Sequence, residues 1–354
     1  MVNIQDLLNI TIEKKASDLH LIAHNQPCLR VDGELLFLGT EEVLSEESVR
    51  ELIFEMLTDE QKELLVNNKE IDFSFDLAER GRFRVNVYNQ KGSLAAALRF
   101  IPAELKSIDE LGLPQICHQF AALNQGFVLV TGPTGHGKST TLAAIINEIL
   151  INRNCNIITI EDPIEFVFKN NSRSLVSQRE LGQDTHSWSA ALRSVLREDP
   201  DVVLIGEMRD YDTISAALTI AETGHLVFST LHTNSASQTI DRVIDAFPEE
   251  AKNQIRIQLS TCLEAVFSQR LLPGLDGRRV LAHEVMVASP AIKTAIRDGK
   301  THMLDNIMQT SGSLGMSTLE NSLVKLVDEG KVTLDVARLY ALRPEEVNRM
   351  IKKI

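Results

Sequence analysis

An eight-residue segment near the middle of the chain restricts the fold more than any other feature. Residues 132–139 read Gly-Pro-Thr-Gly-His-Gly-Lys-Ser, which matches the pattern G-x-x-x-x-G-K-[ST]. An apolar run typical of a buried strand, Phe127–Val130, precedes the segment, and a stretch with helical spacing follows it. The glycines allow the backbone to curl so that its N–H groups point at an anion. The sequence therefore predicts a strand, a phosphate-binding loop and a helix in direct succession.

The residue types in this loop are those needed to hold ATP together with Mg²⁺. Lys138 is expected to reach the β- and γ-phosphates, and the hydroxyl of Ser139 is expected to bind the metal. The positive end of the following helix adds to the attraction for phosphate. A glycine-rich turn without function is the alternative, and the strand–loop–helix context argues against it. The residues predicted to contact the nucleotide are Gly132, Pro133, Thr134, Gly135, His136, Gly137, Lys138, Ser139 and Thr140.

Two further apolar runs end in carboxylates. Ile157–Ile160 is followed directly by Glu161, and Val202–Ile205 is followed closely by Glu207. The carboxyl ends of strands in an open α/β sheet are the edge where ligands bind. A carboxylate at that edge can orient the attacking water or hold the metal through water, so both acids are candidates for catalysis. From position alone, an exposed acidic turn explains the acids around Glu161 equally well.

Two histidines flank the apolar run Leu226–Phe228. His232 is a candidate to hydrogen-bond the γ-phosphate and so to report its presence during catalysis. His225 is a candidate for nucleotide binding, and a purely structural role is an equal alternative for it.

The hydrophobic pattern divides the chain into two domains with a linker between them. Residues 1–101 predict a small α+β domain. Two prolines and a glycine mark residues 102–114 as the linker. In residues 115–354, apolar runs that include Val280–Val287 alternate with helical stretches, which predicts an α/β domain around a parallel sheet buried on both faces. Helices are expected to close the chain from about residue 290.

Within the first domain, three local patterns can be read. Residues 46–66 are expected to be helical, and Asp32-Gly33 is a hairpin turn signal between two short apolar runs. In residues 82–87, apolar and polar side chains alternate, which predicts a strand with its arginines on the face away from the core.

Composition narrows the class of partner. The formal net charge of −13 repels polyanions as a whole and argues against nucleic acid as the main partner. The four cysteines are widely spaced, which favours reduced thiols over a disulfide framework or a zinc site. No apolar stretch reaches the roughly 18 residues of a membrane span, and the first residues lack the pattern of a signal peptide. We therefore expect a cytoplasmic protein without direct membrane insertion.

Four segments together resemble the Walker A, Asp box, Walker B and His box of the secretion ATPase superfamily. They are residues 132–139, 160–165, 201–210 and 221–234. The amino-acid sequences of these segments are most similar to those of the type IV pilus retraction ATPases, the PilT branch of that superfamily. The same resemblance covers residues 312–316 and, in the N-terminal domain, residues 16–20 and 82–86, so it spans almost the whole chain.

The resemblance implies a RecA-like P-loop ATPase core and a PAS-like N-terminal domain, assembled as a homo-hexameric ring that hydrolyses ATP to power pilus retraction and twitching motility. Glu161 would orient the attacking water, and Glu207 would lie near Mg²⁺. Arg84 and Arg99 of the N-terminal domain would contact phosphate. The partner would be the inner-membrane platform protein of the pilus machine, which places the ring at the inner face of the cytoplasmic membrane.

Two alternatives stay open. Residues 291–298 keep the frame of a C-terminal motif of the retraction ATPases but depart from it at Thr294-Ala295, which leaves a PilU-type accessory retraction ATPase. Such a paralogue could equally be a partner of this chain. From another class, a RecA-like nucleic-acid motor would share the fold. A regulator that binds nucleotide without hydrolysing it is disfavoured, because the lysine, serine and both glutamates named above are present.

Overall fold

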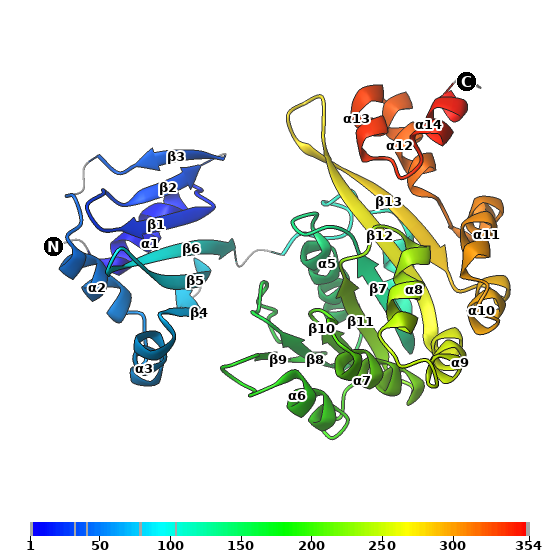
Figure 1. Ribbon diagram of the computed structural model, residues 1–354, viewed down its shortest axis with the longest axis horizontal. Coiled ribbons are helices and arrows are strands. Elements are labelled where there is room, and N and C mark those ends of the chain that lie inside the picture. Colours follow the sequence, from blue (N-terminus) through cyan, green and yellow to red (C-terminus); the bar gives the residue numbers. More distant parts are fainter. Residues whose placement is uncertain (1–2, 32, 40–41, 78–79, 103–104, 352–354) are drawn as a thin grey trace. The chain divides into compact units, whose positions relative to one another are not determined.

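Two sheets, each with its own buried core, organise the chain (Figure 1). The computed structural model describes residues 3–31, 33–39, 42–77, 80–102 and 105–351. Met1–Leu105 together with Pro163–Val167 form the N-terminal unit, and Lys106–Asp162 together with Phe168–Ile354 form the core unit. Residues 106–114 of the predicted linker thus belong to the core unit, where Ile108 is completely buried.

The N-terminal unit is an α+β fold around a six-stranded antiparallel sheet with the strand order β3-β2-β1-β6-β5-β4. On β5, Phe83, Val85 and Val87 are fully buried, and the side chains between them point to the opposite face, as the alternation predicted. The elements of this unit are α1 (Ile4–Glu13), β1 (Asp18–Ile22), β2 (Cys28–Val31), β3 (Glu34–Phe37), α2 (Glu46–Phe54), α3 (Asp59–Asn68), β4 (Glu70–Leu77), β5 (Gly81–Gln90) and β6 (Ser93–Pro102).

The structure refines two local predictions for this unit. The helical residues 46–66 form two helices, because Thr58 starts a new one with a capping box. Its hydroxyl accepts from the backbone N–H of Gln61, and the Gln61 side chain accepts from the backbone N–H of Thr58. The predicted hairpin turn joins β2 to β3, and Gly33 has a φ of +90° there. Asp32 lies outside the described residues.

The core unit contains a seven-stranded sheet with the order β13-β12-β7-β11-β10-β8-β9. All neighbours in it pair in parallel except β13, which is antiparallel to β12. The parallel sheet is confirmed for the four inner runs, whereas the run Val280–Val287 proves to be an antiparallel edge strand, and β9 and β12 were not predicted. The strands are β7 (Gly126–Thr131), β8 (Asn156–Glu161), β9 (Leu175–Glu180), β10 (Val202–Ile205), β11 (Leu226–Leu231), β12 (Leu263–Pro273) and β13 (Arg279–Val287).

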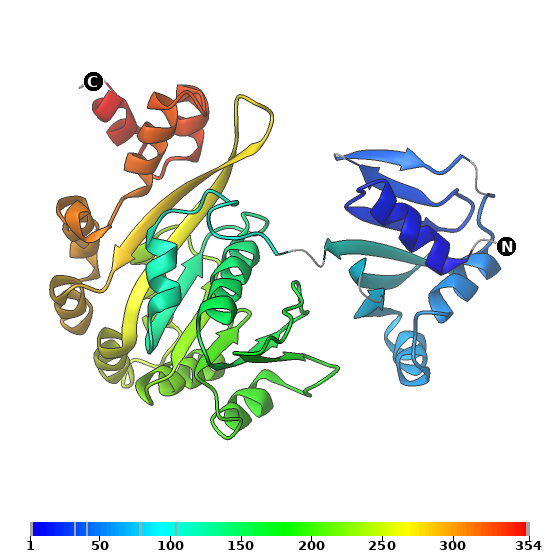
Figure 2. The same ribbon diagram turned by 180° about the vertical axis from the view of Figure 1, so that it is seen from behind.

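Helices cover both faces of this sheet. Every residue of β7 and of β11 is buried, as expected for strands that are covered on both sides. One face carries α4 (Ile116–Ala122) and α5 (Lys138–Asn152), which lie in front of the sheet in Figure 2. The opposite face carries α6 (Trp188–Val195), α7 (Tyr211–Glu222), α8 (Ala236–Asp245) and α9 (Lys252–Cys262).

The C-terminal part of the chain is helical, as predicted from about residue 290. Leu272 and Ala282 of the β12–β13 hairpin share a small separate core with α12, α13 and α14. The elements are α10 (Pro290–Arg297), η2 (Thr301–Met303), α11 (Leu304–Thr310), η3 (Gly312–Leu314), α12 (Leu319–Asp328), α13 (Leu334–Tyr340) and α14 (Pro344–Ile351).

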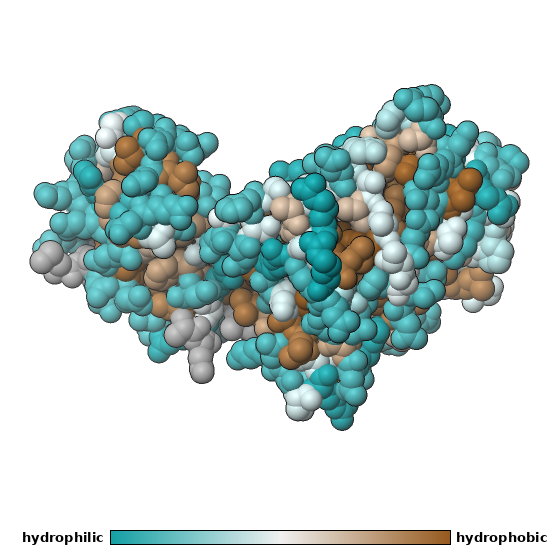
Figure 3. Space-filling model, turned by 90° about the horizontal axis from the view of Figure 1, so that it is seen from below, coloured by the Kyte–Doolittle hydropathy of each residue, from teal (hydrophilic) through white to brown (hydrophobic). Residues whose placement is uncertain are grey.

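The polarity of the surface and the state of the cysteines match what the composition predicted. On the face shown in Figure 3, hydrophilic residues cover most of the surface, and hydrophobic residues occur in separate patches. Among the described residues, no helix combines the length and the apolar character needed to cross a membrane. All four cysteines are free and buried, as expected for reduced thiols. Burial raises the pKa of Cys117 and that of Cys262 to about 12.

Candidate active site

The loop predicted to bind phosphate lies at the carboxyl edge of the core sheet, where residues 132–137 join β7 to α5. Gly132, Gly135 and Gly137 have φ values of +141°, +78° and +83°, which favour glycine. A Cβ atom on Gly132 would also collide with the main-chain oxygen of Gln269 on β12. The predicted curl is therefore present, and its first glycine allows a neighbouring strand to approach closely.

Lys138, His232 and Glu207 form a connected network at this edge. The Lys138 ammonium donates to the carbonyl oxygens of Gly132 (2.9 Å) and Pro133 (3.0 Å) and to Nδ1 of His232 (3.3 Å). Since an ammonium can only donate, Nδ1 accepts, and the protonated Nε2 of His232 donates to Oε2 of Glu207 at 3.1 Å. The imidazole therefore connects the lysine that should hold phosphate to the acid that should lie near the metal.

Two further side chains complete this network. The hydroxyl of Thr134 lies 3.3 Å from Nδ1 of His232. Glu207 also forms an ion pair with Arg209, which follows it on the same loop. Arg209 is a further member of the site that was not predicted, although it stands within the Walker B-like segment.

The donors at this edge fit Mg²⁺. Ser139 and Thr140 lie in the first turn of α5 and are half-buried. Glu207 follows β10, which is separated from β7 by β11, so the two strand ends are about 10 Å apart. One hydroxyl and one carboxylate suit this ion, because Mg²⁺ keeps several waters and takes further ligands from the phosphates of its nucleotide.

Glu161 closes β8 and is held by two neighbours. The hydroxyl of Thr159 donates to its Oε1 at 2.6 Å, and Nε2 of Gln178 donates to the same oxygen at 3.1 Å. Gln178 stands opposite Thr159 in the parallel register of β8 and β9. Only 8% of Glu161 is exposed, whereas the next residue, Asp162, is exposed. Glu161 is thus an oriented side chain at the strand end, and the interpretation as an exposed acidic turn does not apply to it.

The two histidines around β11 lie at opposite ends of that strand. His225 precedes β11, and its carbonyl oxygen accepts from the N–H of Gly126 at the start of β7. Its Nδ1 lies 3.0 Å from the Thr223 hydroxyl and 3.1 Å from the Ile220 carbonyl oxygen. A strand of six residues separates it by about 20 Å from the edge where His232 stands. The structure therefore brings His232, but not His225, to the loop of its own core unit, and the local contacts of His225 are structural.

The loop is held from behind by the β12–β13 hairpin, which sequence analysis missed. Gln269 donates through Nε2 to the carbonyl oxygen of His136 at 2.6 Å, and the N–H of Leu271 donates to Nδ1 of His136 at 2.9 Å. Arg279 donates to the carbonyl oxygen of Gly135 at 3.4 Å. Burial, aided by nearby cations, lowers the pKa of His136, which suits its use as an acceptor. His136 anchors the loop to β12, and its predicted contact with nucleotide stays a prediction.

Arg84 and Arg99 stand directly opposite each other on β5 and β6 of the N-terminal unit. Residues opposite each other in an antiparallel pair share a face, so the two guanidinium groups form a cationic spot on the polar face of the sheet. Nε of Arg99 donates to Oδ1 of the largely buried Asp18 at 2.9 Å, while 69% of the Arg99 side chain is exposed. The predicted phosphate contacts of both arginines stay predictions.

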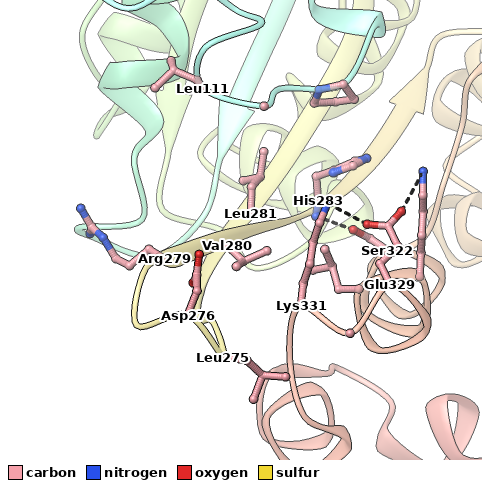
Figure 4. A pocket seen from close by; sticks show the side chains of 15 residues that line it. Leu111, Leu275, Asp276, Arg279, Val280, Leu281, His283, Ser322, Glu329 and Lys331 are labelled. Atoms are coloured by element: carbon pink, nitrogen blue, oxygen red, sulfur yellow. Dashed lines mark hydrogen bonds and ion pairs between the residues drawn. The ribbon is translucent and has the colours of Figure 1, made fainter.

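One cavity of the core unit has a volume of about 530 Å³ (Figure 4). Its walls come from residues 111–114, from the β12–β13 hairpin and from α12 with the turn that follows it. Arg279 lines this cavity and also reaches the loop carbonyl of Gly135. Lys331 in its wall is paired with Glu329 at 2.7 Å. The residues that line it do not include those predicted to act on phosphate.

A family model described as "Type II/IV secretion system protein" matches residues 2–338, which is nearly the whole chain.

The chain belongs to this family.

Individual relatives place it more closely within the secretion-system family. It is 46% identical over 344 residues to "Type IV pilus retractation ATPase PilT" of Pseudomonas aeruginosa, covering 97% of this chain and 99% of that protein. It is 37% identical over 349 residues to "Type IV pilus ATPase PilU" of the same organism, covering 98% and 91%. A crystal structure of "the Pilus Retraction Motor PilT and Bound ADP" matches with a TM-score of 0.93 and 45% identity, over 99% of this chain and 100% of that one.

These likenesses confirm the predicted fold class and the predicted membership of the retraction branch of the secretion ATPases. They also confirm that the chain is an ATPase that uses a nucleotide, in agreement with the loop described above.

Proposed function

We propose that this chain hydrolyses ATP with Mg²⁺ to power type IV pilus retraction, and through it twitching motility. The observation that carries the hydrolytic activity is the network of Lys138, His232 and Glu207 at the carboxyl edge of the core sheet. The likeness to PilT over nearly the full length of both chains supports the link to pilus retraction.

The site residues divide the work of phosphoryl transfer in this proposal. Loop N–H groups and the positive end of α5 hold the phosphates, and Lys138 turns from its loop carbonyls toward the β- and γ-phosphates. Ser139 and Glu207 hold Mg²⁺, which neutralises charge on the phosphate oxygens. Glu161, oriented by its two hydrogen bonds, positions the attacking water and accepts its proton. His232 senses the γ-phosphate through its contact with Lys138.

The proposal extends to the assembly. The chain forms a homo-hexameric ring at the inner face of the cytoplasmic membrane and acts on the inner-membrane platform protein of the pilus machine. Arg84 and Arg99 stabilise phosphate charge during turnover. An arginine that acts as a finger contributes about 10³–10⁵ in rate, so loss of either one should be easy to measure.

Deletion of the gene tests this function. Surface pili should persist or accumulate while twitching movement stops, and the wild-type chain supplied in trans should restore movement. Sizing chromatography of the purified chain with ATP and Mg²⁺ should show a species near six subunits. Undiminished twitching in the deletion strain would refute the retraction role, and a fully active monomer would refute the ring.

A PilU-type accessory role is the second candidate, because the chain also covers PilU over nearly its full length at 37% identity. A strain that lacks every paralogue and expresses only this chain separates the two roles. Retraction in that strain indicates a self-sufficient motor, and its absence indicates an accessory ATPase. A nucleic-acid motor has less support at a net charge of −13, and hydrolysis stimulated by DNA would be its signature.

A further inference from the structure

The side chain of Glu284 on β13 lies almost fully buried between the N-terminal ends of two helices. Its Oε1 accepts from the N–H of Ala236, the first residue of α8, at 2.6 Å, and the backbone N–H of Leu319, the first residue of α12, lies near enough to lower the pKa of this carboxyl group. The first N–H groups of a helix lack partners within the helix, and its positive end favours negative charge. One carboxylate therefore lies at the start of two helices that are far apart in the sequence.

The α8 end of this junction leads directly to the phosphate-binding loop. His232 is separated from α8 by three residues that are tied to the first turn of the helix. The hydroxyl of Thr233 lies 2.6 Å from that of Thr239, and the N–H of Asn234 donates to Oε1 of Gln238 at 3.3 Å. A shift at the start of α8 would therefore move the imidazole that contacts the loop lysine.

The α12 end leads to the C-terminal helices. Just before α12, Ser317 exchanges two backbone hydrogen bonds with Val285 of β13, at 2.8 and 3.1 Å. On α12 the completely buried Glu320 binds Arg343 at 3.0 Å, and Arg343 also binds Asp305 of α11 at 3.0 Å. A shift of the C-terminal helices would therefore displace Leu319 at the start of α12.

We propose that Glu284 is a positioning residue that sets His232 against the γ-phosphate and couples this setting to the position of the C-terminal helices. The inference rests on the proposed ATPase function and deepens it. It also gives a role to the segment Gly312–Met316, which ends directly before the junction and delivers α12 to it. Glu284 forms its hydrogen bond with α8 and not with the loop, so its effect on turnover is transmitted through α8.

The surroundings of Glu284 explain why a carboxyl group is needed there. Burial raises its pKa to about 7, the charges of Asp305 and Glu320 act in the same direction, and the backbone N–H groups of Ala236 and Leu319 oppose them. Arg270 of β12 lies near enough for its positive charge to interact with both glutamates. An apolar side chain would avoid this burial of charge but would leave the buried N–H of Ala236 without its acceptor. The carboxyl group thus satisfies the start of α8 and offers negative charge to the start of α12.

Glu284→Gln in the full chain tests the inference. An amide offers one acceptor oxygen and places an NH₂ group where the second carboxylate oxygen stood, so it cannot present an acceptor to the starts of both helices. We expect kcat to fall about tenfold with KM changed less than about threefold, and the preference for a non-hydrolysable ATP analogue over ADP to fall about tenfold. In a His232→Ala background the same change should alter that preference less than about twofold, because contacts that act through one residue are not additive.

Glu320→Gln is the matched control, since this carboxyl group is equally buried and lies one residue beyond Leu319 but does not contact α8. It should lower the melting temperature and weaken the preference for the ATP analogue less than Glu284→Gln does, because it loosens the C-terminal helices but keeps the contact of Glu284 with Ala236. Ala236→Pro removes the α8 contact from the other side, at a helix position that tolerates proline, and decides the matter if Glu284→Gln does not fold.

An unchanged preference for the ATP analogue in the Glu284 variant, or equal losses in the Glu284 and Glu320 variants, would overturn the inference while leaving the proposed function intact. A wild-type chain that hydrolyses no ATP would instead overturn the proposed function itself. The two failures are therefore distinguishable in the same set of measurements.

Discussion

Replacement of Gly132 by alanine should destabilise the core unit for two separable reasons. The residue has a φ of +141°, which side chains other than glycine rarely adopt, and such a conformation costs on the order of 1–3 kcal/mol. The added Cβ would also collide with the main-chain oxygen of Gln269. A backbone atom within a paired strand cannot turn away as a flexible side chain can, and forced shifts of this kind cost about 1–3 kcal/mol more.

Gly135→Ala separates these two causes. Gly135 also has a positive φ, +78°, but a Cβ there would meet nothing within 4 Å. The collision should therefore make the Gly132 variant less stable than the Gly135 variant by about 1–3 kcal/mol. For a unit of this size, that difference corresponds to about 2–12 °C in melting temperature.

Calorimetry of the full chain without nucleotide measures this difference, because it removes any contribution from ligand binding. A Gly132 variant that melts at or above the temperature of the Gly135 variant would refute the close approach of β12 to the loop. Equal and large losses in both variants would show that backbone conformation alone accounts for the effect.

Three further predictions concern single side chains. Lys138→Ala should abolish phosphate release from ATP, because no other side chain of the loop supplies charge to the β- and γ-phosphates, and normal turnover would sink the loop assignment. Glu161→Gln should bind a fluorescent ATP analogue normally but hydrolyse ATP slowly, whereas the hydrolysis rate of Glu207→Gln should depend more strongly on the Mg²⁺ concentration. Equal Mg²⁺ dependence in the two variants would show that the two glutamates do not have separate roles. Since the folded pKa of Glu284 is raised from 4.5 to about 7, its contribution to stability is complete below about pH 4.5 and is lost as the pH rises toward 7. Glu284→Gln should therefore flatten the fall in melting temperature over that pH range, and an unchanged slope would contradict the raised pKa.

The parts of the fold that could be predicted from sequence are those with a local signal. The loop at 132–139 can be recognised from the spacing of its glycines and from its place between a strand and a helix. The inner strands can be recognised as apolar runs, because both of their faces are buried. The break between α2 and α3 also had a local signal that was missed, since Thr58 and Gln61 have the spacing of a capping box.

The remaining parts depend on partners that are distant in sequence. The strand β12 carries Ser268, Gln269 and Arg270 in its middle, so it lacks the continuous apolar run that marks β7, β10 and β11. Two of these side chains act on distant partners: Gln269 holds the carbonyl oxygen of His136, 133 residues away, and Arg270 donates to the carbonyl oxygen of Tyr340. Glu284 is similar, because a lone acid in an apolar run gives no indication that it caps the start of α8.

The burial of all four thiols has a practical consequence for following the motion of this motor. A maleimide reacts with a thiolate, and burial both hides the sulfur atoms and, at Cys117 and Cys262, keeps them protonated far above neutral pH. A cysteine placed on the exposed surface of α14, for example, would then react much faster than the four native ones. Dyes attached in this way could report on domain movement during turnover in an otherwise unaltered chain, without first replacing any native cysteine.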